Sequence, residues 1–191
     1  MLLRMLCVLV LVGMVVGSVA WMGAEEPGAS QARRKQLVEM MQAGNYKEAY
    51  EGFRKLALDP ADDPLQVGHD LNLATQCLQN LNRTDEIDDF REAVIQVHPQ
   101  NWRLLWAAAQ NYMGVQHEGF IVAGKFHRGH HRGGGRQVSS LERDRVRAVQ
   151  LMVRAIPLAQ KDDKHAEVGN FFMNLAQMLL HNRGFDASWR L

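Results

Sequence analysis

The chain has 191 residues, a length that fits one domain of ordinary size. Hydrophobic residues make up 47% of it and charged residues 23%, which excludes an intrinsically disordered chain. The formal net charge is only +1, so the chain as a whole has no electrostatic attraction to nucleic acid or to an anionic membrane. Any preference for a charged partner must therefore be local.

The N-terminus has the features of an export signal. A positively charged start precedes an apolar run at residues 5–17, and small residues at and before Ala20 suit cleavage at that point. The sequence therefore predicts a signal peptide at residues 1–20. The alternative is an uncleaved membrane anchor, because residues 5–24 are about long enough to span a bilayer. Either way the rest of the chain is predicted to be exported, to the periplasm or as a cell-surface or secreted protein.

Cysteine usage adds little to this picture. Cys7 lies in the predicted signal, which leaves Cys77 as the only cysteine of the exported part. A single cysteine cannot form an internal disulfide. Its apolar surroundings predict a small buried side chain rather than a nucleophile.

The exported part is predicted to be helical almost throughout. Residues 21–30 form a short polar linker, and residues 31–191 form the helical domain. Apolar residues recur at helical spacing, glycine and proline fall between the periodic segments, and no segment predicts a strand. The first helical pair is expected at about residues 31–58, with a turn at Gly44.

The second half of this pair, AGNYKEAYEGFRKLALDP, resembles a tetratricopeptide repeat. The family's tight turn, small residue, aromatic residue and closing Asp-Pro are matched by Gly44, Asn45, Tyr46, Ala49, Phe53, Asp59 and Pro60. Two short antiparallel helices cannot bury their apolar faces alone, so such pairs stack on one another. The resemblance implies an all-α solenoid of stacked antiparallel helix pairs.

Further helical pairs follow along the chain. The second pair is expected at about residues 64–80 and 84–97. The third pair begins at Trp102, and its second helix comes only after a long insertion at about residues 115–138. Acidic residues such as Asp88 in the second pair are expected on the solvated side of their helix.

The second helix of the third pair has clear boundaries in the sequence. A capping box, Ser139 to Glu142, is expected to start it and Pro157 to end it. Its predicted apolar face consists of Val146, Val149, Met152, Val153 and Ile156. A fourth pair starts at about residue 164, and a further helix begins at Ala187. Because one helical turn cannot bury an apolar stripe, the chain is expected to be the beginning of a longer protein.

The insertion contains the stretch EGFIVAGKFHRGHHRGGGR, residues 118–136, which is one residue short of a phosphate-binding P-loop between Gly119 and Lys125. A P-loop follows a strand, precedes a helix, and has Ser or Thr after the lysine to hold Mg²⁺. Here Phe126 follows the lysine, the preceding segment is helical, and the following glycines do not start a helix. Nucleotide binding is therefore not expected.

Metal binding is a weak alternative for the same stretch. Neutral imidazoles are good ligands of zinc and copper, and the weak candidates are His127, His130 and His131. The four neighbouring basic side chains would repel a divalent cation. A solvated polar loop is favoured over a metal site, and no cofactor is predicted.

Anion binding is the better functional hypothesis for the insertion. Its candidate residues are Lys125, Arg128, Arg132 and Arg136. The glycines allow backbone N–H groups to converge on an anion, and arginine pairs well with carboxylate or phosphate. A mobile, solvated loop without a ligand is the plainer alternative and is favoured. The apolar residues 120–122 suggest that the first part packs on the helices or pairs with something outside them.

Residues 119–163 and 182–191 resemble the N-terminal helical region of large exported alpha-2-macroglobulin-like proteins of planctomycete-type bacteria. The order of signal, helical repeats, glycine-rich basic insertion and further helices also agrees, over roughly residues 30–191. The resemblance implies an accessory module of a protease-trapping protein whose working parts lie downstream. No thioester residue carries over, because Cys77 is followed by Leu-Gln-Asn, which does not match the family's Cys-x-Glu-Gln motif.

The sequence therefore predicts an exported, non-enzymatic stack of helix pairs that contacts proteins. No Gly-x-Ser-x-Gly or His-Glu-x-x-His motif is present. The first hypothesis is the N-terminal module of a larger macroglobulin-like protein, which contacts its own downstream domains or a protein partner. A free-standing periplasmic adaptor is the second. An anion- or metal-binding protein that acts through residues 118–136 is the third.

Overall fold

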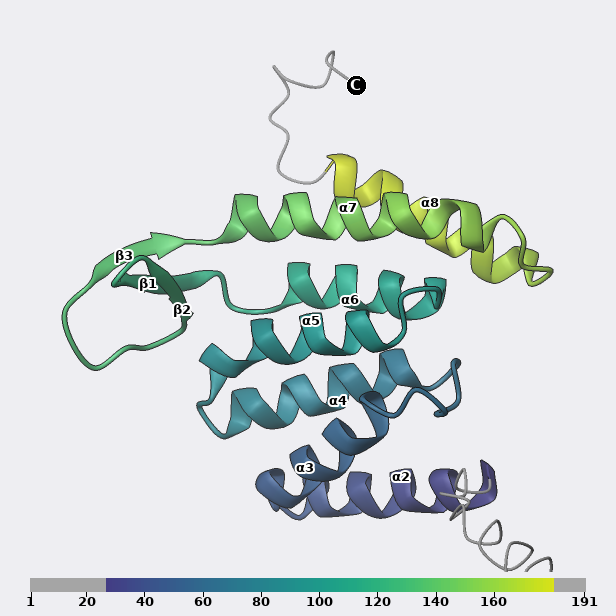
Figure 1. The fold of residues 1–191 in the computed structure, drawn as a ribbon, viewed down its shortest axis with the longest axis horizontal. Coiled ribbons are helices and arrows are strands. Elements are labelled where there is room, and N and C mark those ends of the chain that lie inside the picture. Colours follow the sequence, from purple (N-terminus) through teal and green to yellow (C-terminus); the bar gives the residue numbers. More distant parts are fainter. Residues whose placement is uncertain (1–26, 181–191) are drawn as a thin grey trace, which may run out of the picture.

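The computed structural model describes residues 27–180, in which helices follow one another from one end of the molecule to the other (Figure 1). The described part is mostly helical, as predicted. Its helices are α2 (Pro27–Gln42), α3 (Tyr46–Ala57), α4 (Val67–Asn80), α5 (Ile87–Val97), α6 (Trp102–Gly114), α7 (Leu141–Ala159) and α8 (His165–Leu180), with a short 3-10 helix η1 (Thr84–Glu86) before α5.

Several sequence predictions fall outside or at the edge of this range. The predicted signal peptide and the helix expected from Ala187 lie outside the described residues. Residues 27–30, predicted as part of a linker, belong to α2. Within residues 27–180, no helix is both long and apolar enough to cross a membrane.

Local sequence signals account for most helix boundaries. Gly44 has a φ of +85°, a left-handed conformation that suits glycine, and it separates α2 from α3 as predicted. Asn101 precedes α6, and its side-chain oxygen accepts the N–H groups of Arg103 and Leu104, both at 3.1 Å. Gly44 thus lets the chain turn where α2 ends, and Asn101 accepts hydrogen bonds from backbone N–H groups where α6 begins.

Two predicted boundaries of α7 are wrong in detail. The residue before the helix is Ser140, and the expected capping box does not form, because the Ser139 hydroxyl accepts the N–H of Leu141 instead of that of Glu142. Pro157 lies inside the helix, which continues to Ala159. A proline in the last turn removes one backbone hydrogen bond without stopping the remaining turn from closing.

One apolar core runs along the stack between neighbouring helices. Its fully buried large side chains include Phe53, Leu71, Leu78, Ile87, Leu104, Leu105, Leu151 and Met152. Fully buried alanines at the helix contacts, such as Ala49, Ala74 and Ala155, let the backbones approach closely. Cys77 is buried in this core, as predicted, and burial raises the pKa of its thiol to about 11.

An aromatic cluster attaches α8 to α6. Phe171 is fully buried, and its ring meets the edges or faces of Trp102 and Trp106 with centroids 5.7 and 6.0 Å apart. Arg103 forms ion pairs with Asp162 at 2.8 Å and with Glu167 at 2.7 Å. Apolar burial and charge pairing therefore both hold the last described helix on the stack.

The prediction that no strand occurs is wrong. Between α6 and α7 the chain forms a three-stranded antiparallel sheet in the order β2–β1–β3, from β1 (Glu118–Val122), β2 (Lys125–Arg128) and β3 (Arg136–Ser139). The apolar run that the sequence placed in a loop is the central strand, and it pairs with both neighbours. Figure 1 shows this sheet at one side of the stack, next to the start of α7.

Candidate functional site

The segment that resembled a P-loop is a β-hairpin. Ala123 and Gly124 form its turn with φ values of +48° and +81°, the paired positive values of a tight two-residue hairpin turn. The chain therefore reverses after β1 and runs back as β2, with Ile121 opposite Phe126. A P-loop needs a strand, an open loop and a helix in succession, so this geometry does not provide a phosphate cradle.

Arg128, a predicted anion ligand, lies in the interior and not at the surface. The residue is only 2% exposed, and its guanidinium forms ion pairs with Asp88 of α5 at 2.8 Å and with Asp144 of α7 at 2.9 Å. Its Nη1 atom donates to the backbone oxygen of Gln116 and to the Ser140 hydroxyl. Every nitrogen of the guanidinium already has a partner within the protein. The prediction that Arg128 binds an external anion is therefore wrong.

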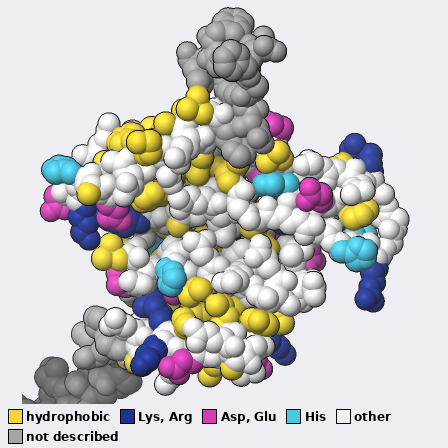
Figure 2. Space-filling model, turned by 180° about the vertical axis from the view of Figure 1, so that it is seen from behind, with side chains coloured by type: hydrophobic (Ala, Val, Ile, Leu, Met, Phe, Trp, Pro, Cys, Tyr) yellow, Lys and Arg dark blue, Asp and Glu magenta, His cyan; other side chains and the backbone are white. Residues whose placement is uncertain are grey.

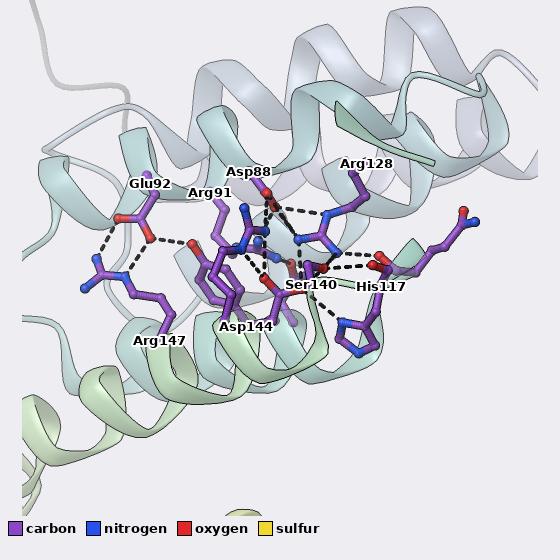
Figure 3. A network of polar contacts seen from close by, with 12 residues as sticks. Asp88, Arg91, Glu92, His117, Arg128, Ser140, Asp144 and Arg147 are labelled. Carbon is purple, nitrogen blue, oxygen red and sulfur yellow. Dashed lines mark hydrogen bonds and ion pairs between the residues drawn. The ribbon is translucent and has the colours of Figure 1, made fainter. Parts of the chain in front are cut away.

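Asp88 and Asp144 are the centre of a buried polar network (Figure 3). Asp88 accepts from Arg91 at 2.6 Å and from Arg143 at 2.7 Å, in addition to Arg128. Asp144 is fully buried and also pairs with Arg143, at 2.7 Å. The two carboxylates thus connect α5, the β2 strand and the start of α7.

Two further donors complete the surroundings of Asp144. The Ser140 hydroxyl donates to Asp144 Oδ2 at 2.7 Å, and His117 Nδ1 lies 2.9 Å from the same oxygen. Burial by itself would raise the pKa of Asp144, but the hydrogen bonds from Ser140, His117 and Arg143 outweigh burial and hold the pKa below its usual value. Asp144 is therefore an ionised structural anchor rather than a proton donor near neutral pH.

A second branch of the network joins α5, α6 and α7. Arg147 donates to both oxygens of Glu92, at 2.8 and 2.6 Å, and the Tyr112 hydroxyl donates to Glu92 at 2.5 Å. The guanidinium of the fully buried Arg91 lies 3.2 Å from the centroid of the Tyr112 ring. Although burial would raise the pKa of Glu92, the hydrogen bonds from Arg147 and Tyr112 lower it.

The network fastens the sheet to the helices from both sides. The Thr84 hydroxyl of η1 donates to the backbone oxygen of Arg128 at 3.0 Å, and Phe126 of β2 lies against Arg143, whose guanidinium carbon is 4.5 Å from the ring centroid. Buried ion pairs that lose one partner leave an uncompensated charge. The arrangement therefore holds the insertion in one place, and its carboxylates are occupied by arginines.

The other three predicted anion ligands remain at the surface. Lys125, Arg132 and Arg136 are exposed. Lys125 lies 3.7 Å from Asp89, while Arg132 and Arg136 form no ion pair with any residue in the range 27–180. Figure 2, which views the molecule from behind, shows basic and histidine side chains projecting on the side where the sheet lies.

Two of the three histidines proposed as weak metal ligands lie close together. The rings of His127 and His131 have centroids 5.3 Å apart, whereas the third histidine, His130, is exposed. Across the described part of the chain, no three His, Cys, Asp or Glu side chains are placed to hold a metal ion.

A second buried ion cluster lies near the other end of the stack. Arg34 of α2 pairs with Asp70 of α4 at 2.8 Å and with Asp62 at 2.5 Å. Arg34 and Asp62 border a hollow of about 690 Å³ between α2 and α4. Burial raises the pKa of Asp70 to about 6, even though the Arg34 hydrogen bond acts in the opposite direction.

The sequence did not predict the role of Asp88 in the main network. Asp88 was expected on a solvated helix face, but its side chain is 23% exposed and accepts from three arginines. The sequence carried one local signal for this role, since Arg91 stands three residues after Asp88 on the same helix. The pairing with Arg128 had no local signal, because 40 residues separate the two.

Comparisons with known proteins identified no relative of this chain. No protein-family model matches the chain, and neither a curated protein nor a solved structure is significantly similar to it.

Proposed function

We propose that this chain is a non-catalytic protein-interaction module of stacked, tetratricopeptide-like helix pairs, exported as the N-terminal part of a larger polypeptide. Its support is the succession of helices α2 with α3, α4 with α5 and α6 with α7, joined by short turns except at the sheet. In such a stack each helix pair buries its apolar faces against its neighbours in sequence.

The observation that carries the proposal is an apolar stripe on the outer side of α8. Gly169, Met173, Ala176 and Leu180 recur at helical spacing, and all four are exposed. Met173 is 62% and Leu180 53% exposed, whereas Phe171 on the other side of the helix is buried against α6. A helix that is apolar on both sides belongs inside a packed structure.

The occupant that fits this stripe is the helix that follows α8 in the same polypeptide. A following helix would continue the contact that each earlier helix makes with its neighbour, and the stripe has the spacing of a helix–helix interface. The resemblance of residues 119–163 and 182–191 to macroglobulin-like exported proteins suggests the larger polypeptide: a protease-trapping protein with this module as an accessory part. In a free-standing adaptor, a separate protein would cover the stripe.

Site-specific photo-crosslinking in the producing cells tests the proposal. A photoreactive phenylalanine at position 173 is expected to crosslink to a segment of the same polypeptide beyond α8, identified by mass spectrometry. In the matched control, the photoreactive phenylalanine replaces the exposed Gln96 of α5 and is expected to give no specific product. A crosslink to a separate protein would favour the adaptor, and equal yields from both positions would contradict both forms of the proposal.

The anion-binding alternative rests on fewer residues than the sequence suggested. Without Arg128, its candidate ligands are Lys125, Arg132 and Arg136, all of them solvated. If these residues bind phosphate, millimolar phosphate should raise the melting temperature of the chain, and the rise should vanish in Arg132→Ala with Arg136→Ala.

A further inference from the structure

A row of side-chain carboxamides crosses α4, α6 and α8. Asn111 of α6 donates to Asn72 of α4 at 3.0 Å, and the adjacent Gln110 donates to Asn174 of α8. Asn174 in turn donates to Gln177 at 3.3 Å. Hydrogen bonds thus join Asn72 with Asn111, and Gln110 with Asn174 and Gln177. The two groups meet at the adjacent residues Gln110 and Asn111, so five amide side chains follow one another over three helices.

Two hollows lie along this row. The first has a volume of about 280 Å³, and its lining includes Asn72 and Gln79 from α4 and Gln110 from α6. The second, of about 150 Å³, is lined by Met113, Asn174, Gln177 and Met178. Among the described residues that line either hollow, none is Asp, Glu, Lys or Arg, which contrasts with the charged network around Asp88.

The hydrogen bonds within the row leave outward-facing groups available. Asn72 Nδ2, Gln110 Oε1 and Gln177 Nε2 have no hydrogen-bond partner among residues 27–180, and all three side chains are exposed. From α4 to α8 these groups are a donor, an acceptor and a donor. Asn111, by contrast, is buried and holds Arg91 through its oxygen at 2.8 Å.

A carboxamide has the same donor and acceptor groups as a peptide unit, so the row suits the main chain of another polypeptide. An uncharged lining disfavours a charged ligand, because a charge removed from water without a counter-charge is costly. Neighbouring helices lie about 8–10 Å apart and an extended chain rises about 3.3 Å per residue, so the row spans about five or six residues.

We infer that the carboxamide row binds an extended, uncharged polypeptide segment through its main chain, with small side chains in the two hollows. This inference rests on the proposed function in that it assumes a protein partner, and it names the chemistry of that partner. It concerns α4, α6 and the side of α8 that carries Asn174 and Gln177, which adjoins the stripe around Met173 that the proposed covering helix contacts.

A random display library of twelve-residue peptides, selected on the full chain, provides the test. The peptides that are enriched are expected to be depleted of Asp, Glu, Lys and Arg. Binding of the best peptide should weaken about threefold to tenfold in Gln110→Ala and again in Gln177→Ala, the loss of one hydrogen bond each. N-methylation of its main-chain amides should abolish binding, because recognition is through the main chain.

The matched controls are Gln96→Ala and Gln160→Ala, exposed glutamines outside the row whose loss should leave binding unchanged. Circular dichroism of each variant shows whether its helices are intact. The inference is overturned if no peptide is enriched, if the enriched peptides are charged, or if binding ignores the Gln110 and Gln177 changes. Crosslinking from position 173 is independent of this result, so a failure here leaves the proposed function standing.

Discussion

At the scale of single residues, burial separates Arg128 from the other basic side chains of residues 118–136. All four look alike in sequence, with glycine, histidine and arginine around them. Only the approach of Asp88 and Asp144 from two helices removes Arg128 from water and neutralises it. Its role is thus structural, while Lys125, Arg132 and Arg136 stay solvated.

Arg128→Met is expected to destabilise the chain by about 3 kcal/mol, at the low end for a broken buried ion pair, because Arg143 still pairs with both carboxylates. Arg132→Met, a matched change in the same loop, should alter stability by no more than about 0.5 kcal/mol. Urea denaturation measures both free energies of unfolding. Equal effects would show that Arg128 is not a buried anchor.

Asp70 predicts a pH dependence of stability. Its pKa is raised by burial to about 6, above the ordinary value of 3.8, so the folded state binds the proton more tightly than the unfolded state. The stability from this site is therefore full below about pH 4 and is lost as the pH rises through 6, by at most about 3 kcal/mol.

The Asp70→Asn variant isolates this effect. The difference in free energy of unfolding, wild type minus Asp70→Asn, should fall between pH 4 and pH 7 and stay level above that range. Denaturant titrations at each pH measure it. A difference that is constant or that rises over the same range would refute the assignment.

At the scale of elements, the apolar pattern of α7 located the helix correctly but only partly identified its buried face. The predicted face contained Val146 and Val153, which are 55% and 54% exposed. The fully buried apolar residues of this helix are Ala148, Leu151, Met152, Ala155 and Ala159. Three of these five residues are alanines, because close contact with α6 leaves little room for a side chain at their positions, a restriction that hydrophobicity alone does not show.

The end of β2 depends on one glycine. Gly129 has a φ of +80°, and a Cβ added there would lie 2.2 Å from the Thr84 hydroxyl oxygen. Gly129→Ala should therefore destabilise the chain by about 1–3 kcal/mol, measured by thermal or urea denaturation. Gly134→Ala, where a Cβ meets nothing within 4 Å, should cost no more than about 0.5 kcal/mol.

A double-mutant cycle shows whether the contact with Thr84 is the cause. In a Thr84→Ala background the cost of Gly129→Ala should shrink, because the clashing hydroxyl is gone. An undiminished cost would assign the effect to backbone strain alone.

At the scale of the whole molecule, each helix should be stabilised mainly by its neighbours in the stack, so that a change at one end has little effect at the other. Phe171 holds α8 against Trp102 and Trp106, while α2 and α3 lie at the opposite end (Figure 1). Phe171→Ala should cost about 3–5 kcal/mol and should reduce amide hydrogen-exchange protection in α8 far more than in α3.

The neighbouring Phe172→Ala is the control for this change, because that side chain is 37% exposed. It should leave exchange in both helices close to that of the unmodified chain. A uniform loss of protection in all described helices of Phe171→Ala would show instead that the stack unfolds as one cooperative unit.

The sequence by itself determined the helices and their order, because helix formation depends on residues three or four positions apart and on local signals such as Gly44 and Asn101. It also located residues 118–136 between two helices. The tertiary structure decided that this stretch is a sheet and that Arg128 lies beneath it. Strand pairing joins residues up to about twenty positions apart, and the pairing of Arg128 with Asp88 spans 40. Such contacts leave no periodic trace in a sequence, and they exist only once the packed helices bring the partners together.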